Sequence, residues 1–249
     1  MLRIILSGCS GKMGGVITSL LENDTQAKIV AGVDPYIKSG LPYPVSPVFE
    51  NLPEADVIID FSNPASLDGI IKYAEAHKTP AVLATTGYTD ADIEKIHALS
   101  GSVPVFFTFN MSLGINLLVS LTKRAAQVLG DGFDVEIIEK HHNQKIDAPS
   151  GTAIMLANAV NEVKGEKMIY EYDRHSKRQK REKNEIGIHS VRGGTIVGEH
   201  DVIFAGTDEV VTLSHQAFSK SVFAVGAIKA AKFIADKPCG LYDMKDMIV

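Results

Sequence analysis

The amino-terminal half of the chain alternates short apolar runs with segments of helical periodicity. A continuous apolar run between turn residues is typical of a strand buried on both faces, and apolar residues spaced three and four apart indicate a helix. The predicted strands are Leu2–Ser7 and residues 29–33, 57–61, 81–84 and 103–107. The predicted helices cover residues 16–21, run from a start at Ser62-Asn63-Pro64 to residue 77, and run from a Thr89 cap to residue 99. Strands separated by helices predict an α/β fold with a parallel, Rossmann-type sheet.

The pattern changes after Ser112. Residues 113–129 predict a helix that ends at Gly130, and residues 135–139 predict a strand. Between residues 185 and 216, strands dominate and few helices interrupt them. The expected strands there are residues 188–192, 196–198, 202–204 and 210–213, with a turn at Gly193-Gly194. This half therefore predicts an α+β domain with an open mixed sheet, and because an open sheet face usually needs covering, we expect oligomerisation.

A last helix is predicted over residues 222–235, ended by Pro238. Its expected core residues are Val222, Val225, Ala230, Phe233 and Ile234. The domain boundary is expected near residue 112, with residues 113–219 forming the second domain.

Composition narrows the class of protein. The chain has 249 residues, 45% of them hydrophobic and 22% charged, with a net charge of -5, which is ordinary for a globular protein and gives no reason to expect nucleic acid as a partner. No apolar run approaches the roughly 18–20 residues of a membrane helix, and Gly8 to Gly15 interrupts the N-terminal apolar run too early for a secretory signal. Two cysteines give no disulfide framework, so a cytoplasmic protein is expected.

A glycine-rich turn follows the first predicted strand. Gly8, Gly11 and Gly14 have the spacing G-x-x-G-x-x-G, and Asp34 ends the second strand. In a dinucleotide-binding fold, such glycines let the backbone approach the pyrophosphate, and such an acid accepts hydrogen bonds from the ribose hydroxyls. The alternatives are a tight turn that binds no ligand and, for Asp34, a turn residue before Pro35.

Two other strand ends carry small or polar residues. Ala84-Thr85-Thr86 follows one predicted strand, and Thr108-Phe109-Asn110-Met111 follows the next. Ligands of parallel sheets bind beyond the carboxyl ends of the strands, so both segments suit a sugar or a nicotinamide ring. Thr-Thr-Gly is also a common turn without any ligand.

The stretch from Glu136 to Ala153 carries the clearest chemistry. His141 and His142 can hold or donate a proton near neutral pH, and Lys145 adds a cation. Ser150 is a good N-cap, which leaves the amides of Gly151 and Thr152 at the start of a helix, where they attract an anion. The stretch predicts a pocket for a small anion whose chemistry needs a proton.

Other interpretations of these polar residues are open. Adjacent histidines diverge on a strand or a helix, and no metal-binding motif lies near them, so no metal site is expected. A surface loop that happens to carry His and Lys is the plain alternative. The basic run at residues 172–183 lacks interleaved aromatic residues, and we expect a solvated or mobile loop rather than a nucleic-acid site.

Residues 136–153, E-I-I-E-K-H-H-N-Q-K-I-D-A-P-S-G-T-A, closely resemble the signature E-x-H-H-x-x-K-x-D-A-P-S-G-T-A of the 4-hydroxy-tetrahydrodipicolinate (dihydrodipicolinate) reductase family. The likeness extends to most of the chain. It includes residues 8–14, 84–87, 110–114, 191–200 and 240–244.

The resemblance implies a nicotinamide-dependent reduction in the diaminopimelate route to lysine. It implies proton transfer by His141 and Lys145, and binding of a small dicarboxylate substrate by His142, Gly151 and Thr152. It also implies homotetramers and a C-terminal helix, residues 220–249, that completes the dinucleotide-binding domain of residues 1–112. The residues it implies for the dinucleotide are Gly8, Cys9, Ser10, Gly11, Lys12, Met13, Asp34, Ala84, Thr85, Thr86, Thr108, Phe109, Asn110 and Met111.

The chain departs from the family at two places. Thr108-Phe109 stands where many members have Ala-Ala or Ala-Pro, so the contact with the nicotinamide is expected to differ. Pro35 follows Asp34 where members that take a 2′-phosphate often carry a basic residue, and Asp34 would repel that phosphate. With Lys12 as a partial offset, we expect NADH to be preferred and NADPH tolerated. Two other functions stay open, namely another Rossmann dehydrogenase and a dinucleotide-sensing module without catalysis.

Overall fold

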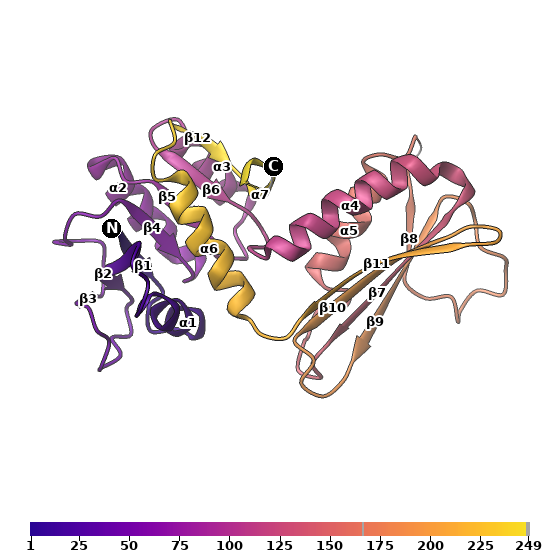
Figure 1. Ribbon diagram of the computed structural model, residues 1–249, viewed down its shortest axis with the longest axis horizontal. Coiled ribbons are helices and arrows are strands. Elements are labelled where there is room, and N and C mark those ends of the chain that lie inside the picture. Colours follow the sequence, from indigo (N-terminus) through magenta and orange to yellow (C-terminus); the bar gives the residue numbers. More distant parts are fainter. Residues whose placement is uncertain (166, 248–249) are drawn as a thin grey trace. The chain divides into compact units, whose positions relative to one another are not determined.

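The computed structural model describes residues 1–165 and 167–247 (Figure 1). It divides into two compact units. The first holds Met1–Leu113 and the described residues from Ser221 onward, and the second holds Gly114–Lys220.

The first unit is built on a parallel sheet of seven strands in the order β12-β6-β5-β4-β1-β2-β3, counted over the described residues. The strands are β1 (Leu2–Ser7), β2 (Ala27–Val33), β3 (Val45–Ser46), β4 (Val57–Asp60), β5 (Ala81–Leu83), β6 (Pro104–Phe107) and β12 (Gly240–Tyr242). The helices are α1 (Lys12–Leu21), η1 (Pro64–Ser66), α2 (Leu67–His77), α3 (Asp90–Leu99), α6 (Ser221–Ile234) and α7 (Met244–Met247). The predicted parallel sheet is confirmed.

Helices cover both faces of this sheet (Figure 1). Residues of α1 and α6 pack on one face, and residues of α2 and α3 pack on the other. Central strands are therefore buried on both sides. For this reason β4 contains the unbroken apolar run Val57-Ile58-Ile59. Thr89 caps α3 through a capping box with Asp92, as the sequence predicts.

The second unit is a mixed sheet of five strands in the order β11-β10-β7-β9-β8, again over the described residues. The strands are β7 (Asp134–His141), β8 (Ile169–Glu171), β9 (Glu185–Arg192), β10 (Gly198–Ala205) and β11 (Val210–Ala217). The helices are α4 (Leu113–Leu129), η2 (Gly130–Gly132) and α5 (Gly151–Asn161). Pairing is antiparallel for β11-β10 and β10-β7, and parallel for β7-β9 and β9-β8, so the expected mixed sheet is confirmed.

Helices α4 and α5 pack on one face of this mixed sheet. Burial therefore alternates along β7, with Val135, Ile137, Glu139 and His141 buried and the residues between them less so. Burial alternates with a period of two because one face of the sheet contacts helices and the other face does not. The functional side chains on β7 are consequently on the helix-covered face.

Three details of the prediction are wrong. The separate strands predicted at 196–198 and 202–204 are one strand, β10, which begins only at Gly198. Val225, predicted in the core, is 38% exposed, because Ala224 and Ala227 occupy the buried stripe of α6 instead. The short strands β3, β8 and β12 were not predicted, since two or three residues give too little periodicity to detect.

The basic run at residues 172–183, which was expected to be a solvated or mobile loop, is held by several ion pairs. Arg174 pairs with Glu185 and Lys177 pairs with Glu171, while Arg181 donates from Nε to Glu136 Oε1 at 3.0 Å. These carboxylates belong to strands or strand ends of the mixed sheet, so the segment is fastened to it. Arg178, Lys180 and Lys183 remain exposed.

Candidate functional site

The turn between β1 and α1 is shaped for close approach of a ligand to the backbone. Gly8 has φ 77°, and a Cβ there would lie 2.4 Å from the carbonyl oxygen of Phe61. A Cβ at Gly14 would lie 2.4 Å from the carbonyl oxygen of Gly8. Gly11 is the N-cap of α1 and provides no side chain to cap it, so the first amides of the helix can bind an anion. These features fit the pyrophosphate of a dinucleotide.

Asp34 lies directly beyond β2 and is buried against this turn. Its Oδ2 accepts the N–H of Ser10 at 3.0 Å, and its Oδ1 accepts the N–H of Tyr36 at 2.9 Å. Each carboxylate oxygen has a further lone pair, so Asp34 can also accept from ribose hydroxyls. Cys9, by contrast, points into the core beneath Gly32, so only its backbone can contact a ligand.

A cavity of about 300 Å³ opens at the carboxyl ends of the strands. Most of the predicted cofactor residues outside the glycine turn line it, which places them where ligands of parallel sheets bind. Its lining consists of Met13, Phe61, Ser62, Ala84, Thr85, Thr86, Thr108, Phe109, Asn110, Met111 and Phe223. Phe109 is 68% exposed and packs edge-on against Phe107, so the aromatic side chain that departs from the family pattern is available to a ligand.

Beneath this cavity lies a fully buried carboxyl group, Asp60 at the end of β4. Ser62 Oγ donates to its Oδ1 at 2.5 Å, and Thr85 Oγ1 and Tyr88 Oη donate to its Oδ2 at 2.6 and 3.2 Å. Burial raises the pKa of Asp60, and hydrogen bonds from these hydroxyls and from Ser7 only partly oppose it. Asp60 thus fixes Ser62 and Thr85, two residues that line the cavity.

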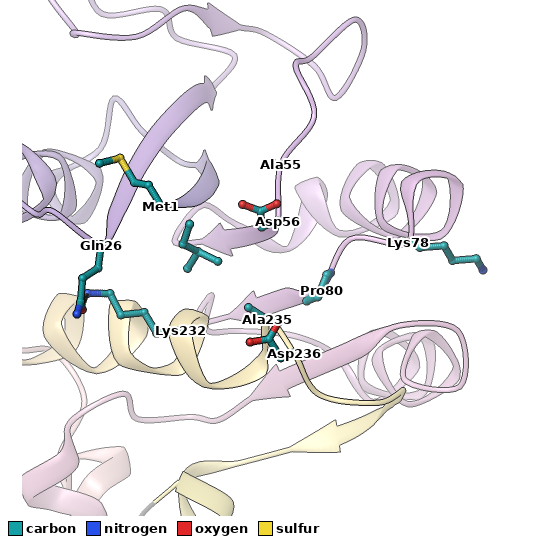
Figure 2. Close-up of a pocket in the computed structure, with 10 residues that line it drawn as sticks. Met1, Gln26, Ala55, Asp56, Lys78, Pro80, Lys232, Ala235 and Asp236 are labelled. Atoms are coloured by element: carbon teal, nitrogen blue, oxygen red, sulfur yellow. Dashed lines mark hydrogen bonds between the residues drawn. The ribbon is translucent and has the colours of Figure 1, made fainter.

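A second opening in the same unit lies at the amino ends of the strands (Figure 2). Its lining includes the acids Asp56 and Asp236 and the lysines Lys78 and Lys232, and two of these four charges are held in ion pairs. Lys232 donates to Asp24 at 3.0 Å, and Asp56 is paired with Arg3 at 2.8 Å. It also lies at the edge of the parallel sheet opposite to the one that binds ligands. We therefore place no cofactor there.

In the second unit, the predicted catalytic residues lie around a buried carboxylate on β7. Glu139 is 0% exposed and accepts two bonds from Arg192, at 2.7 and 2.6 Å. It also accepts from His141 Nδ1 at 2.6 Å and from the backbone N–H of Ser150 at 3.1 Å. Burial alone would raise the pKa of Glu139, but hydrogen bonds from Arg192, His141 and Ser190 outweigh it and lower that pKa to about 2.

His141 is nearly buried, and burial is the main reason that its pKa lies below the ordinary value. Glu139 acts in the opposite direction, while the positive charges of Lys145 and Arg192 add to the lowering. Lys145 Nζ pairs with Asp147 at 2.9 Å, and its backbone N–H donates to the carbonyl of His142. The structure therefore brings His141 and Lys145 into one electrostatic environment.

Helix α5 begins beside this group. Ser150 caps it by accepting the N–H of Ala153 at 3.2 Å, and Gly151 and Thr152 form its first turn, as predicted. No Cβ would meet an obstacle at Gly151, so its backbone is accessible to an anion. Ser150 Oγ also lies 3.1 Å from Nε2 of buried His200, whose pKa burial lowers to about 4.

Sequence reasoning missed several residues of both sites. Glu139 stands two residues before His141, so on a strand the two share a face, and that signal was available. Arg192 and His200 come from β9 and β10, which neighbour β7 only in the folded sheet. Phe223 reaches the cavity from α6, far along the chain, and no local pattern indicates it.

Residues 1–165 and 167–247 contain neither a cluster of metal ligands nor a helix that could span a membrane. Within that part of the chain, no three His, Cys, Asp or Glu side chains are grouped as a metal site requires. Over the same residues, no helix is both long and apolar enough to cross a membrane.

Comparison with known proteins agrees with this geometry. Residues 2–111 match the family model described as dihydrodipicolinate reductase, N-terminus, and residues 114–248 match the one described as dihydrodipicolinate reductase, C-terminus. The chain belongs to the dihydrodipicolinate reductase family. It is therefore an oxidoreductase with a Rossmann-type domain for a pyridine nucleotide.

Individual members of the dihydrodipicolinate reductase family match over the full length. A 4-hydroxy-tetrahydrodipicolinate reductase of Caldanaerobacter subterraneus subsp. tengcongensis is 52% identical over 251 residues, covering 100% of this chain and 98% of the relative. One from Clostridium novyi is 49% identical over 252 residues, with 100% and 98% covered.

Solved structures show the same fold. A dipicolinate-bound dihydrodipicolinate reductase from Paenisporosarcina sp. TG-14 has a TM-score of 0.82 and 26% identity, with 100% of both chains covered. A probable dehydrogenase from Thermotoga maritima has a TM-score of 0.63 at 13% identity, covering 98% of this chain and 92% of the other, which shows likeness of fold alone.

Proposed function

We propose that this protein reduces 4-hydroxy-tetrahydrodipicolinate to tetrahydrodipicolinate in the diaminopimelate route to lysine. One observation carries the proposal. A buried imidazole, a lysine and the first turn of α5 occur together in the second unit of a chain whose first unit fits a dinucleotide. Relatives of about 50% identity bear this activity in their names, and the solved relative is described as dipicolinate-bound.

In this proposal, a domain of residues 1–112 completed by residues 220–249 binds the dinucleotide, and the first unit forms most of it. The turn from Gly8 to Met13 holds the pyrophosphate, and Asp34 accepts from the adenosine ribose. The segments 84–86 and 108–111 contact the nicotinamide side. The reduced dinucleotide supplies hydride when bound.

The remaining residues, 113–219, form the domain that binds the substrate, and the second unit forms most of it. His142 and the amides of Gly151 and Thr152 hold the carboxylates, because a helix start favours negative charge. Loss of the 4-hydroxyl group as water gives a conjugated C=N–C=C system, and hydride addition to that system builds up carbanion-like charge that needs a proton. Lys145 donates that proton and His141 acts as proton donor or acceptor, while the positive charge of Lys145 stabilises the developing anion.

The direct test combines the purified protein, NADH and freshly generated 4-hydroxy-tetrahydrodipicolinate while the absorbance of the reduced nicotinamide is followed. We expect consumption that depends on both substrate and enzyme. A panel of linear semialdehydes with NADH and of amino acids with NAD+ serves as control, because another Rossmann dehydrogenase would reduce or oxidise one of those instead. Cofactor binding without any turnover would favour a sensing module and contradict the proposal.

The preference between the two nucleotides rests on Asp34. Its buried carboxylate is held by two backbone amides, so it cannot turn away from a 2′-phosphate, which it would repel. Lys12 and Lys38 are exposed nearby and offset part of this repulsion. We propose that NADH is preferred and NADPH tolerated. An equal or higher kcat/KM with NADPH would reject this ranking.

We also propose a homotetramer located in the cytoplasm. The face of the mixed sheet away from α4 and α5 carries half-buried residues such as Ile138 and Ile203 beside charged ones, and an extended face of this kind usually packs against another copy. Both cysteines are free thiols, as is usual in a reducing compartment. Sedimentation equilibrium tests the assembly, and a monomer at micromolar concentration would contradict it.

A further inference from the structure

The buried carboxylate of Glu139 connects three parts of the second unit. It accepts from the guanidinium of Arg192 on β9, from the imidazole of His141 on its own strand, and from the amide of Ser150 at the start of α5. Arg192 also donates to the carbonyl oxygen of Asp147, in the loop before α5, at 2.7 Å. A single carboxylate therefore fixes the imidazole and the helix start together.

The contact between Glu139 and His141 also determines which nitrogen of the imidazole ring is available for proton transfer. Glu139 stays ionised between its donors, so Nδ1 of His141 carries a hydrogen and donates it. Nε2 is then the nitrogen that can take up or release a proton. It lies beside Gly198, where a Cβ would come within 3.2 Å, so glycine leaves room around that atom.

We infer that Glu139, held in place by Arg192, is a positioning residue that orients His141 for proton transfer through Nε2 and fixes the anion-binding start of α5 relative to it. The inference rests on the proposed function, because that function gives His141 its proton. It goes further by naming a residue that contacts neither substrate nor cofactor.

The charges around His141 determine the direction in which its pKa should move when Glu139 loses its charge, and this direction can be measured. Lys145 from the loop, Arg192 from β9 and the ring of His200 from β10, whose centroid is 5.2 Å away, face it together with Glu139. Among these groups, Glu139 is the one that favours the imidazolium. Removal of its charge therefore lowers the pKa of His141, whether the histidine acts as acid or as base.

The experiment compares Glu139→Gln with a matched control, Glu136→Gln. Glu136 lies on the same strand and likewise accepts from a histidine and an arginine, His189 Nε2 at 2.8 Å and Arg181 Nε at 3.0 Å, but on the opposite face of the sheet. Each variant is measured for the pH profile of kcat/KM, for NADH affinity by fluorescence, and for titration of the His141 ring by NMR.

For Glu139→Gln we expect turnover to fall by about 10- to 100-fold, as is typical when a proton-transfer group loses its orientation. The His141 titration and the matching limb of the pH profile should both move to lower pH, with NADH affinity unchanged. Glu136→Gln should move neither. An unchanged His141 titration in Glu139→Gln, or an equal shift in Glu136→Gln, would overturn the inference.

A second variant keeps the test open if Glu139→Gln does not fold. Glu139→Asp retains the charge but withdraws it by one methylene, so turnover should fall while the His141 titration stays closer to wild type than in the Gln variant. Wild-type turnover in Glu139→Asp would also overturn the inference. Absence of any activity in the wild type would instead reject the proposed function, and the NMR titration would still test the pairing.

Discussion

Among the described residues, each unit contains one carboxyl group with no exposed surface at or near the end of a strand, and the two groups have opposite surroundings. Asp60 in the first unit is surrounded by hydroxyl groups, and its pKa is raised because burial dominates. Glu139 in the second unit is bound by a guanidinium and an imidazole, and its pKa is lowered to about 2. Both are 0% exposed, so burial alone does not decide the charge of either group.

The difference matches what each unit is proposed to do. A carboxyl group held by neutral hydroxyls fixes two residues in the wall of a binding cavity. A group held by cations keeps its own charge and can hold an imidazole in one orientation. The partners of a buried carboxyl group, rather than its depth, therefore indicate its role.

The largest expected effect concerns Arg192. In Arg192→Met, Glu139 would remain buried without its main cation, and the free energy of unfolding should fall by about 3–5 kcal/mol. Urea denaturation monitored by circular dichroism measures this. A loss below about 1 kcal/mol would mean that Glu139 does not depend on Arg192, and the contrast with Asp60 would disappear.

Next in size is Lys145, which stands beside His141 in the second unit. Lys145→Ala should raise the catalytic barrier by about 2–4 kcal/mol, a loss in turnover of roughly 30- to 1,000-fold, because it removes proton-transfer and electrostatic help. The dissociation constant for NADH should stay the same, since no residue of the first unit changes. Near wild-type turnover would remove Lys145 from the mechanism.

As pH falls, the contributions of the two carboxyl groups to the free energy of unfolding should change in opposite directions. The folded pKa of Glu139 lies below its unfolded value near 4.5, so its contribution is present above that value and is lost as pH falls toward about 2. The folded pKa of Asp60 is raised, so its contribution is present below its unfolded value near 3.8 and is lost as pH rises through the folded value.

Unfolding free energies between pH 7 and pH 3 separate these contributions. Glu139→Gln should make the loss in acid shallower, by about 2 kcal/mol between pH 5 and pH 3, whereas Asp60→Asn should make it steeper. A change of the same sign in both variants would show that the two environments are not opposed.

The smallest expected effect concerns Tyr88. Its hydroxyl donates to Asp60 but does not line the cavity, so Tyr88→Phe should cost only about 1 kcal/mol of unfolding free energy. NADH affinity, measured by fluorescence, should stay within about twofold of wild type, since Ser62 and Thr85 still hold the carboxyl group. A tenfold loss of affinity would show that the hydroxyl network acts as one unit.

Much of the fold could be predicted from the sequence, because buried parallel strands appear as unbroken apolar runs. Thr89 and Ser150 marked helix starts through their own side chains, which is local information. Strand β10 and the exposure of Val225 were mispredicted, since pairing partners and the buried side of a helix depend on the whole sheet. Local patterns fail where neighbours come from distant segments.

The same limit applies to the candidate site. The helix start at Gly151 and the glycine turn were found from spacing, because each is formed by consecutive residues. The partners of Glu139 were not found, since Arg192 lies 53 residues away and meets it only through the β7–β9 pairing. Long-range hydrogen bonds of this kind leave no periodic trace in a single sequence.

The return of the C-terminal segment to the first sheet has a consequence for how the protein folds during its translation. Strand β12 pairs with β6, and α6 packs against β4, β5 and β6, so the entire second unit is translated before the first sheet gains these pieces. While the ribosome is still extending the chain, one apolar face of that sheet stays partly uncovered. The nascent protein should therefore expose that apolar face until α6 has emerged from the exit tunnel.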